Sequence, residues 1–276
     1  MTLPPITVVV GIDFKTLQQL EVSYRTWKLH QPQMYEWPWI VFSDGTSDFL
    51  SLHAQESMKH RGVVPIHTKF LRWPQCAGLK KVKAESQREF MLAGHVWVPA
   101  LHVETEWYCK IDTDALATRP AKWPEPGWFH PRADDNRECV VVAPRWTYTK
   151  GIDFLKRLDD WGDTAKIVSD CGRMNIQCEP NQLRVGHPRW CSWNSFYRTS
   201  WAREAVELLR ATGHEGTLPI PSQDTFHWYV AERGGKYVRT AHMKKCGWNN
   251  YPKITNLIET AQAIMRGEQQ EQCADA

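Results

Sequence analysis

Two carboxylates stand two residues apart, directly after the apolar run WYCKI that ends at Ile111. Residues with this spacing at the end of a strand project to the same side of a sheet, so Asp112 and Asp114 can share one cation. Their like charges repel, and a divalent ion that also binds phosphate oxygens relieves the repulsion, as in many Mg²⁺ and Mn²⁺ sites. A solvated turn with incidental acids is the alternative, and the strand-end position counts against it. As surface-facing acids, both are expected to contribute little to packing.

Basic residues open a predicted helix upstream of this strand. The segment from Gly78 to Ala93 carries apolar residues at helical spacing, and Lys80 and Lys81 lie in its first turn. A helix N-terminus and two ammonium groups could both face a diphosphate. Lysines that are simply solvated at a helix start are the commoner arrangement, and both interpretations stay open.

The region from Cys171 to Tyr197 holds two further candidate groups. Thiols and an imidazole that could together hold Zn²⁺, although in no short Cys-x-x-Cys spacing, are Cys171, Cys178, His187 and Cys191. Aromatic and polar residues of the kind that wall sugar or base sites are Trp190, Trp193 and Asn194. Core packing beside the following helix explains the second group equally well.

The elements that must position these residues alternate along the first half of the chain. Apolar, β-branched runs predict strands over 7–12, 39–42, 62–66 and 107–111. Helical patterns lie between them at about 15–29, 49–60 and 78–93. Strands that alternate with helices predict an α/β fold with a largely parallel sheet, in which ligands bind at the carboxyl ends of the strands.

The second half is less regular. Strands are predicted at 139–143 and 236–239, and helices at 153–161, 201–211, 226–232 and 255–266. Residues 163–195 show no sustained period, so loops and short strands are expected there. Because there is no internal repeat and no low-complexity linker, we expect one domain over residues 1–276.

Composition bounds the class of protein. The 276 residues carry a formal net charge of +3 and are 42% hydrophobic and 24% charged, which excludes a disordered, collagen-like or coiled-coil chain. Apolar runs fall short of the roughly 20 residues of a membrane span and no secretory signal is visible, so we expect no membrane span, a cytoplasmic protein and reduced cysteines. The 15 tryptophans suggest aromatic clefts, although core packing is the commoner role of any one of them.

Two segments resemble a known family. The run WIVFSDGTSD from Trp39 to Asp48 looks like the second strand and acidic turn of GT-A glycosyltransferases, and Asp112-Thr113-Asp114 looks like their metal-binding DxD motif. The resemblance covers residues 1–120 well and the rest weakly. It implies a GT-A type, Rossmann-like fold with a mixed, mainly parallel central sheet flanked by helices. Residues 1–120 would then bind the nucleotide sugar and residues 121–276 the acceptor.

The same resemblance assigns roles to single residues. Gly11 and Asp13 would border the nucleotide, Asp44 would face its base, and Asp112 with Asp114 would hold Mn²⁺ or Mg²⁺ on the diphosphate. Lys80 and Lys81 are the candidates for further diphosphate contacts. A UDP-sugar is the expected donor, although Ser43 stands where many members have an acid, which leaves the nucleotide open.

Two residues of the second half complete the implied site. Asp224 in the segment PSQDT resembles the acid that these transferases bring to the acceptor, where it would act as general base or, more simply, cap the following helix. His242 falls where many members supply a histidine ligand, and imidazole suits Mn²⁺. A histidine without any ligand role is the alternative.

The function that these features imply is transfer of a sugar to a hydroxyl acceptor. A glycan or another small hydroxylated acceptor is the default, and a hydroxylated DNA base is a minority alternative at so small a net charge. A nucleotidyltransferase is a second class, but it usually carries a Gly-rich loop with a basic residue after its first strand, which Gly11 to Phe14 lack. A non-catalytic carbohydrate or nucleic-acid binding module is the third.

Overall fold

Four parallel strands form the first part of a central sheet. The computed structural model describes residues 2–12, 14–43, 51–72, 97–121, 123–131, 136–148, 188–190, 194–211, 236–242, 246–251 and 253–268. In the order β3-β2-β1-β4, the first strands are β1 (Ile6–Ile12), β2 (Trp39–Ser43), β3 (Lys69–Arg72) and β4 (Trp107–Ile111). Every neighbouring pair among them is parallel. All residues of β2 and β4 are buried, which explains why these strands are apolar on both faces.

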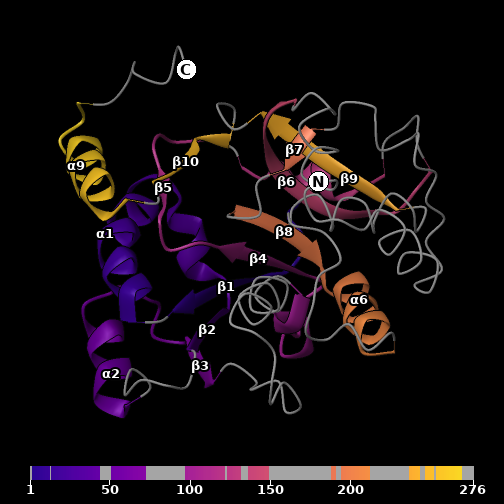
Figure 1. Cartoon of the computed structure of the whole chain (residues 1–276), viewed down its shortest axis with the longest axis horizontal. Coiled ribbons are helices and arrows are strands. Elements are labelled where there is room, and N and C mark those ends of the chain that lie inside the picture. Colours follow the sequence, from indigo (N-terminus) through magenta and orange to yellow (C-terminus); the bar gives the residue numbers. More distant parts are fainter. Residues whose placement is uncertain are drawn as a thin grey trace, which may run out of the picture.

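Strands from the second half of the chain extend the same sheet beyond β4. These are β6 (Cys139–Tyr148), β7 (Pro188–Trp190), β8 (Asn194–Arg198) and β9 (Tyr237–His242). β8 pairs antiparallel with both β4 and β6, and β9 pairs in parallel with β6. Therefore β4, β6 and β9 run in the same direction and end at the same edge. The mixed, mainly parallel α/β sheet flanked by helices that the sequence predicts is confirmed (Figure 1).

Helices lie on two sides of this sheet. The helices and 3-10 turns are α1 (Phe14–His30), η1 (Pro32–Glu36), α2 (Leu52–His60), η3 (Val98–Leu101), η4 (Pro126–Phe129), α6 (Thr199–Ala211) and α9 (Ile254–Met265). In Figure 1, α1, α2 and α9 lie together at the left, and α6 lies apart from them at the right. A separate two-stranded antiparallel sheet of β5 (Ala115–Ala117) and β10 (Trp248–Asn250) lies beside α1.

Tryptophan is prominent in the core between α1 and the sheet. Trp27 of α1 is fully buried, its ring centroid lies 6.3 Å from that of Trp39 and 6.2 Å from that of Trp248, and its Nε1 donates to the carbonyl of Ala115 over 2.7 Å. Described tryptophans with buried side chains are Trp27, Trp39, Trp97, Trp107, Trp123, Trp201 and Trp248. Core packing, rather than an aromatic cleft, is therefore the role of these seven.

The strand predicted over residues 62–66 is wrong, because this segment ends helix α2 instead. Gly62 takes a left-handed conformation with φ of 66°, its N–H donates to the carbonyl of Lys59, and the N–H of Val63 donates to that of Met58. These two bonds form a Schellman cap, and the apolar Val63 and Val64 are buried behind it. The third strand of the sheet is β3, seven residues further along the chain than the start predicted from the sequence.

The other described elements agree with the sequence, with shifted ends. β6 and β9 are longer than predicted, and β5, β8 and β10 are additions within regions for which no regular element is predicted or only short strands are. The predicted helices at 78–93, 153–161 and 226–232 lie outside the described residues. Three cysteines, Cys109, Cys139 and Cys246, are free and buried, as expected of reduced thiols.

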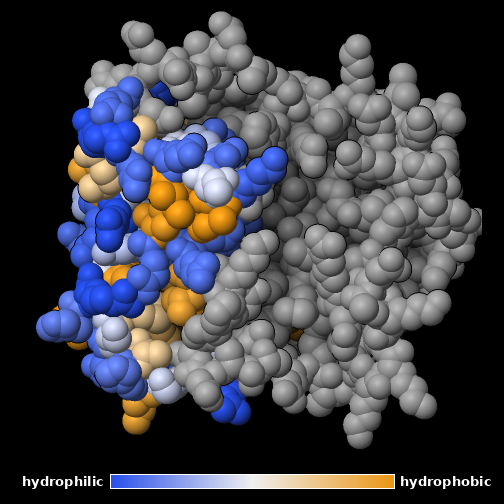
Figure 2. Space-filling model, turned by 60° about the vertical axis from the view of Figure 1, so that its left-hand side comes forward, coloured by the Kyte–Doolittle hydropathy of each residue, from blue (hydrophilic) through white to orange (hydrophobic). Residues whose placement is uncertain are grey.

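The side of the molecule formed by α1 and α9 is charged with scattered apolar patches (Figure 2). The two helices leave a groove of about 310 Å³ lined by Glu21, Val22, Arg25, Ile258, Ala261, Gln262, Met265 and Arg266. Within the described parts of the chain, no helix has both the length and the apolar character needed to cross a bilayer.

Candidate functional site

The carboxyl ends of the parallel strands bring Gly11 and the DxD segment together. Val10 of β1 pairs with Ile111 of β4, so the next residues, Gly11 and Asp112, follow side by side at one edge of the sheet. Gly11 also pairs with Phe42 at the end of β2. Gly11 and Asp112 are both half-buried. The structure thus places two sequence-predicted site residues next to each other, at the edge where α/β sheets bind ligands.

Helix α1 fixes the turn that carries the two aspartates. Between the half-buried Asp112 and Asp114, Thr113 is buried, and its hydroxyl donates to Oε1 of Gln19 over 3.0 Å. The hydroxyl of Ser23 donates to the carbonyl of Thr113 over 2.6 Å. Because the middle residue is held by its side chain and its backbone, the flanking carboxylates are presented at the surface in a defined arrangement.

A segment far along the chain holds the other side of the turn. The N–H of Tyr251 donates to the carbonyl of Asp114 over 2.9 Å, and Asn250 of β10 pairs with Ala115 of β5. This hydrogen bond and this strand pairing were not predicted from the sequence. A signal for the pairing exists in the apolar run ALA directly after the DxD, which is typical of a short strand that needs a partner.

Lys110 is the feature of this site that sequence reasoning overlooked. It lies in β4, two residues before Asp112, which directly follows the strand, and this spacing directs both side chains to the same side. The Lys110 side chain is only 7% exposed, and its Nζ forms an ion pair with Oδ1 of Asp112, whose side chain is 35% exposed. A buried ammonium needs such a partner, since an unpaired charge in the interior is costly.

Comparisons with known proteins rest on structure, because no protein-family model matches the chain and a search of curated proteins finds no match. Core-mannan synthase A from Aspergillus fumigatus, in its Mn/GDP form, superposes with a TM-score of 0.56 over 90% of this chain and 75% of its own, at 10% identity. A mannosyltransferase from S. cerevisiae in complex with GDP gives 0.52 over 97% and 83%, at 9% identity. The chain has a GT-A fold. At these identities the likeness concerns the fold alone.

The donor set at the edge of this GT-A fold suits a divalent ion. Two carboxylates at a strand end are hard oxygen ligands of the kind that Mn²⁺ and Mg²⁺ take. The Lys110 ammonium already lies against one oxygen of Asp112, so a bound ion would share this carboxylate with the lysine. Among the described residues, no group of three or more acidic, histidine or cysteine side chains is arranged to hold a metal.

The register places His242 at the same edge as Asp112. Cys109 pairs with Phe196, Phe196 with Val142 and Val142 with Arg239, so these four residues share one row across the sheet. Asp112 and His242 each lie three residues beyond that row on strands with the same direction. Because β8 and β6 lie between them, their backbones would be about 14 Å apart in a flat sheet. The register alone therefore does not bring the imidazole to the carboxylates.

Of the residues expected to contact the acceptor, Trp190 lies in β7 and Asn194 opens β8. Asn194 pairs with Ile111 beside the DxD, but it is only 1% exposed, and its Oδ1 accepts a hydrogen bond from the Cys109 thiol over 3.4 Å. In this arrangement Asn194 packs into the sheet core rather than lining an open surface.

Several sequence-predicted residues lie outside the described part of the chain. They are Asp13, Asp44, Lys80, Lys81, Trp193, Asp224 and the four residues of the zinc hypothesis, Cys171, Cys178, His187 and Cys191. Their roles stay predictions.

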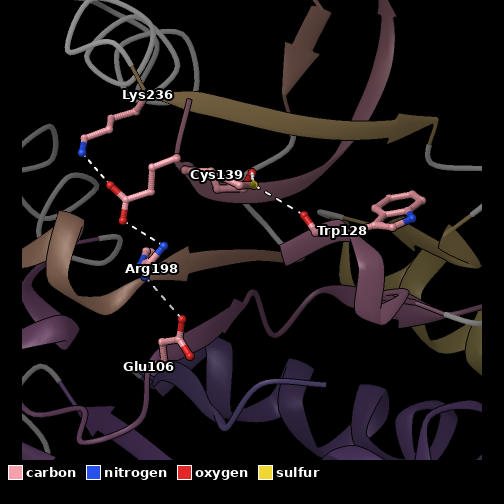
Figure 3. Close-up of polar contacts among 7 residues, drawn as sticks. Glu106, Trp128, Cys139, Arg198 and Lys236 are labelled. Carbon is pink, nitrogen blue, oxygen red and sulfur yellow. Dashed lines mark hydrogen bonds and ion pairs between the residues drawn. The ribbon is translucent and has the colours of Figure 1, made fainter. Parts of the chain in front are cut away.

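The opposite edge of the sheet is closed by an ion-pair chain (Figure 3). Glu138, just before β6, accepts from Lys236 Nζ over 2.5 Å and lies 2.8 Å from Nη1 of Arg198 at the end of β8. Arg198 Nη2 lies 3.5 Å from Glu106, just before β4. These charges, of which Glu106 is exposed and the others half-buried, join the starts of β4, β6 and β9 to the end of β8. They leave the carboxyl edge, with its aspartates, as the edge suited to a ligand.

Proposed function

We propose that the protein is a metal-dependent glycosyltransferase that moves a sugar from a nucleotide-sugar donor to a hydroxyl acceptor. The observation that carries this proposal is the position of Asp112 and Asp114 beside Gly11, at the carboxyl edge of a sheet with the GT-A fold. Asp112 and Asp114 would hold Mn²⁺ or Mg²⁺, which neutralises the charge of the leaving diphosphate when it is bound.

The remaining roles divide between the two halves of the chain. In the donor half, residues 1–120, Gly11 would let the nucleotide approach the backbone closely, because it has no side chain. Asp13 would border the nucleotide, Asp44 its base, and Lys80 with Lys81 the diphosphate. In the acceptor half, residues 121–276, Asp224 would accept the proton of the attacking hydroxyl. Further expected contributions there are His242 toward the metal, and Trp190 and Trp193 toward the acceptor, whereas the buried Asn194 would act through the packing of β8.

The nucleoside of the proposed donor is either uridine or guanosine. The two fungal structures were obtained with GDP, one of them also with Mn, which supports a divalent ion and a nucleoside diphosphate for this chain as well. The sequence favours a UDP-sugar, for which these structures offer no support. We therefore propose both donors as candidates and let the experiment decide.

The acceptor that we propose is a glycan or another small hydroxylated molecule. The formal net charge of +3 offers little of the electrostatic attraction that most nucleic-acid binding needs, so a hydroxylated DNA base remains the minority alternative. The cytoplasmic location stays a prediction from the sequence.

A donor screen tests the proposal. Purified protein is incubated with UDP- and GDP-sugars in the presence of Mn²⁺, and release of the nucleoside diphosphate is measured with and without EDTA. We expect hydrolysis or transfer with one donor class, its loss in EDTA, and its loss in Asp114→Asn. Glu104→Gln, which changes an exposed acid of the ion pair with Lys69, is the matched control and should keep full activity. Folded protein that releases nothing from any donor would contradict the proposal.

A further inference from the structure

Lys110 differs from every other charged side chain in the described parts of the chain. Among the buried polar and charged residues it is the only lysine, and no arginine, aspartate or glutamate accompanies it. It lies in the middle of the sheet, where it pairs with Val9 of β1 on one side and with Ser195 of β8 on the other. Its side chain is buried, and its ammonium contacts Asp112, the first residue of the DxD turn.

In this ion pair, Lys110 competes with any other cation for one oxygen of Asp112. Lys110 Nζ contacts Oδ1 of Asp112, which directly follows the last residue of β4, so the contact joins the strand to the start of the DxD turn. Asp112 and Asp114 are both half-buried, so part of each side chain reaches the surface. The Lys110 ammonium therefore adds one positive charge beside the carboxylates.

This charge has a consequence for what the site binds. With Lys110 present, the site is more positive by one unit charge than it would be without it. This added charge weakens the attraction of the carboxylates for a bare divalent ion and strengthens the attraction of the ion-loaded site for a diphosphate. Rotation of Lys110 out of the site would require its side chain, which is only 7% exposed, to leave a buried position.

We propose that Lys110 is a permanent second cation of the donor site, which holds Asp112 in place and makes tight divalent-ion binding depend on the diphosphate of the nucleotide. This inference rests on the proposed function. Lys110 is thus a positioning and specificity residue: the ion binds weakly alone, and ion and nucleotide strengthen each other's binding.

The first experiment measures Mn²⁺ binding alone, by calorimetry, in the wild type and in Lys110→Met. Removal of a unit charge about 5 Å from a divalent ion in a water-like dielectric should tighten Mn²⁺ binding by about 10-fold. Lys110→Arg keeps the charge and should retain the weak wild-type affinity. Lys69→Met removes the lysine of an exposed ion pair and is the matched control, expected to behave like the wild type. An equal or weaker Mn²⁺ affinity in folded Lys110→Met would overturn the proposal.

Lys110→Met should fold, because Asp112 is a third exposed and water can replace the ammonium. If it does not, Lys110→Gln serves as the uncharged variant with the same expected result. The wild type provides an independent arm: GDP and, in parallel, UDP are titrated with and without Mn²⁺, and the nucleotide that binds should do so at least 10-fold more tightly with the ion. A wild-type protein that binds nucleotide equally well without Mn²⁺ would overturn the proposal without any variant.

These outcomes separate the inference from the proposed function. If neither nucleotide binds under any condition, the glycosyltransferase proposal fails and the role of Lys110 fails with it. If nucleotide and Mn²⁺ bind together in the wild type but the uncharged variants bind Mn²⁺ no more tightly, only the role of Lys110 is rejected.

Discussion

Replacement of Asp112 by alanine should destabilise the fold as well as remove a metal ligand. From the sequence alone, Asp112 is a surface-facing acid whose loss costs little. In the structure, Asp112→Ala leaves the Lys110 ammonium, in a side chain that is 7% exposed, without its carboxylate partner. A buried charge that loses its partner is the situation in which ion-pair mutations are most destabilising.

The size of the effect follows from the burial of the pair. A pair exposed to water contributes at most about 1 kcal/mol, whereas breaking a fully buried pair costs about 3–5 kcal/mol. Because Lys110 is buried and Asp112 is 35% exposed, we place the loss between these limits, at about 2 kcal/mol. For a domain of this size that corresponds to a fall in Tm of about 4–8 °C.

The assay is urea unfolding followed by tryptophan fluorescence, together with thermal unfolding by circular dichroism. Glu104→Ala is the control, since it breaks the Lys69–Glu104 pair, in which both side chains are mostly exposed, and should cost under about 0.5 kcal/mol. The double variant Lys110→Met/Asp112→Ala removes both charges and should recover most of the stability. If Asp112→Ala unfolds at the same urea concentration as Glu104→Ala, the argument from burial is refuted.

Four further results are expected. His242→Ala should weaken Mn²⁺ binding in calorimetry without a change in circular dichroism, and an unchanged affinity would remove His242 from the metal site. Asp224→Asn should keep donor and metal binding but lose about 10²-fold in turnover at saturating substrates if it is the base, whereas near-normal turnover would leave it as a helix cap. Glu138→Gln should lower the free energy of unfolding in urea by about 1 kcal/mol at low salt, and by less at high salt, because the ion pairs of Glu138 are partly exposed and are screened by salt. Equal losses at low and high salt would contradict an ionic role. Burial raises the pKa of the Cys139 thiol from 9.0 to about 11, so the contribution of this thiol to stability is complete below pH 9 and is lost as the pH rises through 11. The free energy of unfolding should therefore be lower at pH 10.5 than at pH 8. Alkylation of this thiol in the folded protein at pH 8 would argue against its burial.

Much of the donor half could be predicted from the sequence, because its information is local. The apolar runs of β1, β2 and β4 and the amphipathic α1 are each encoded in consecutive residues, and alternation of strand and helix leads to parallel pairing. The place of Asp112 and Asp114 at the carboxyl edge follows from the same pattern. The local sequence also led to one wrong prediction, a strand over residues 62–66. Val63 and Val64 have side chains typical of a strand, but they follow Gly62 in a left-handed conformation and form the apolar part of a helix cap.

Only the tertiary structure decided which distant segments meet at the site. β8 lies between β4 and β6 in the sheet, although along the chain it is more than 80 residues from β4 and more than 45 residues from β6. The sequence NSFYR contains no pattern that identifies these two strands as its partners. The hydrogen bond from Tyr251 to Asp114 likewise joins residues that are about half the chain length apart. Lys110 can be read from the sequence, but the importance of its pairing with Asp112 depends on the burial of the Lys110 side chain, which the neighbouring strands create. Local periodicity fixes which way a side chain points along its own strand, whereas burial, and with it the strength of every charge at this edge, is set by the strands that pack beside it.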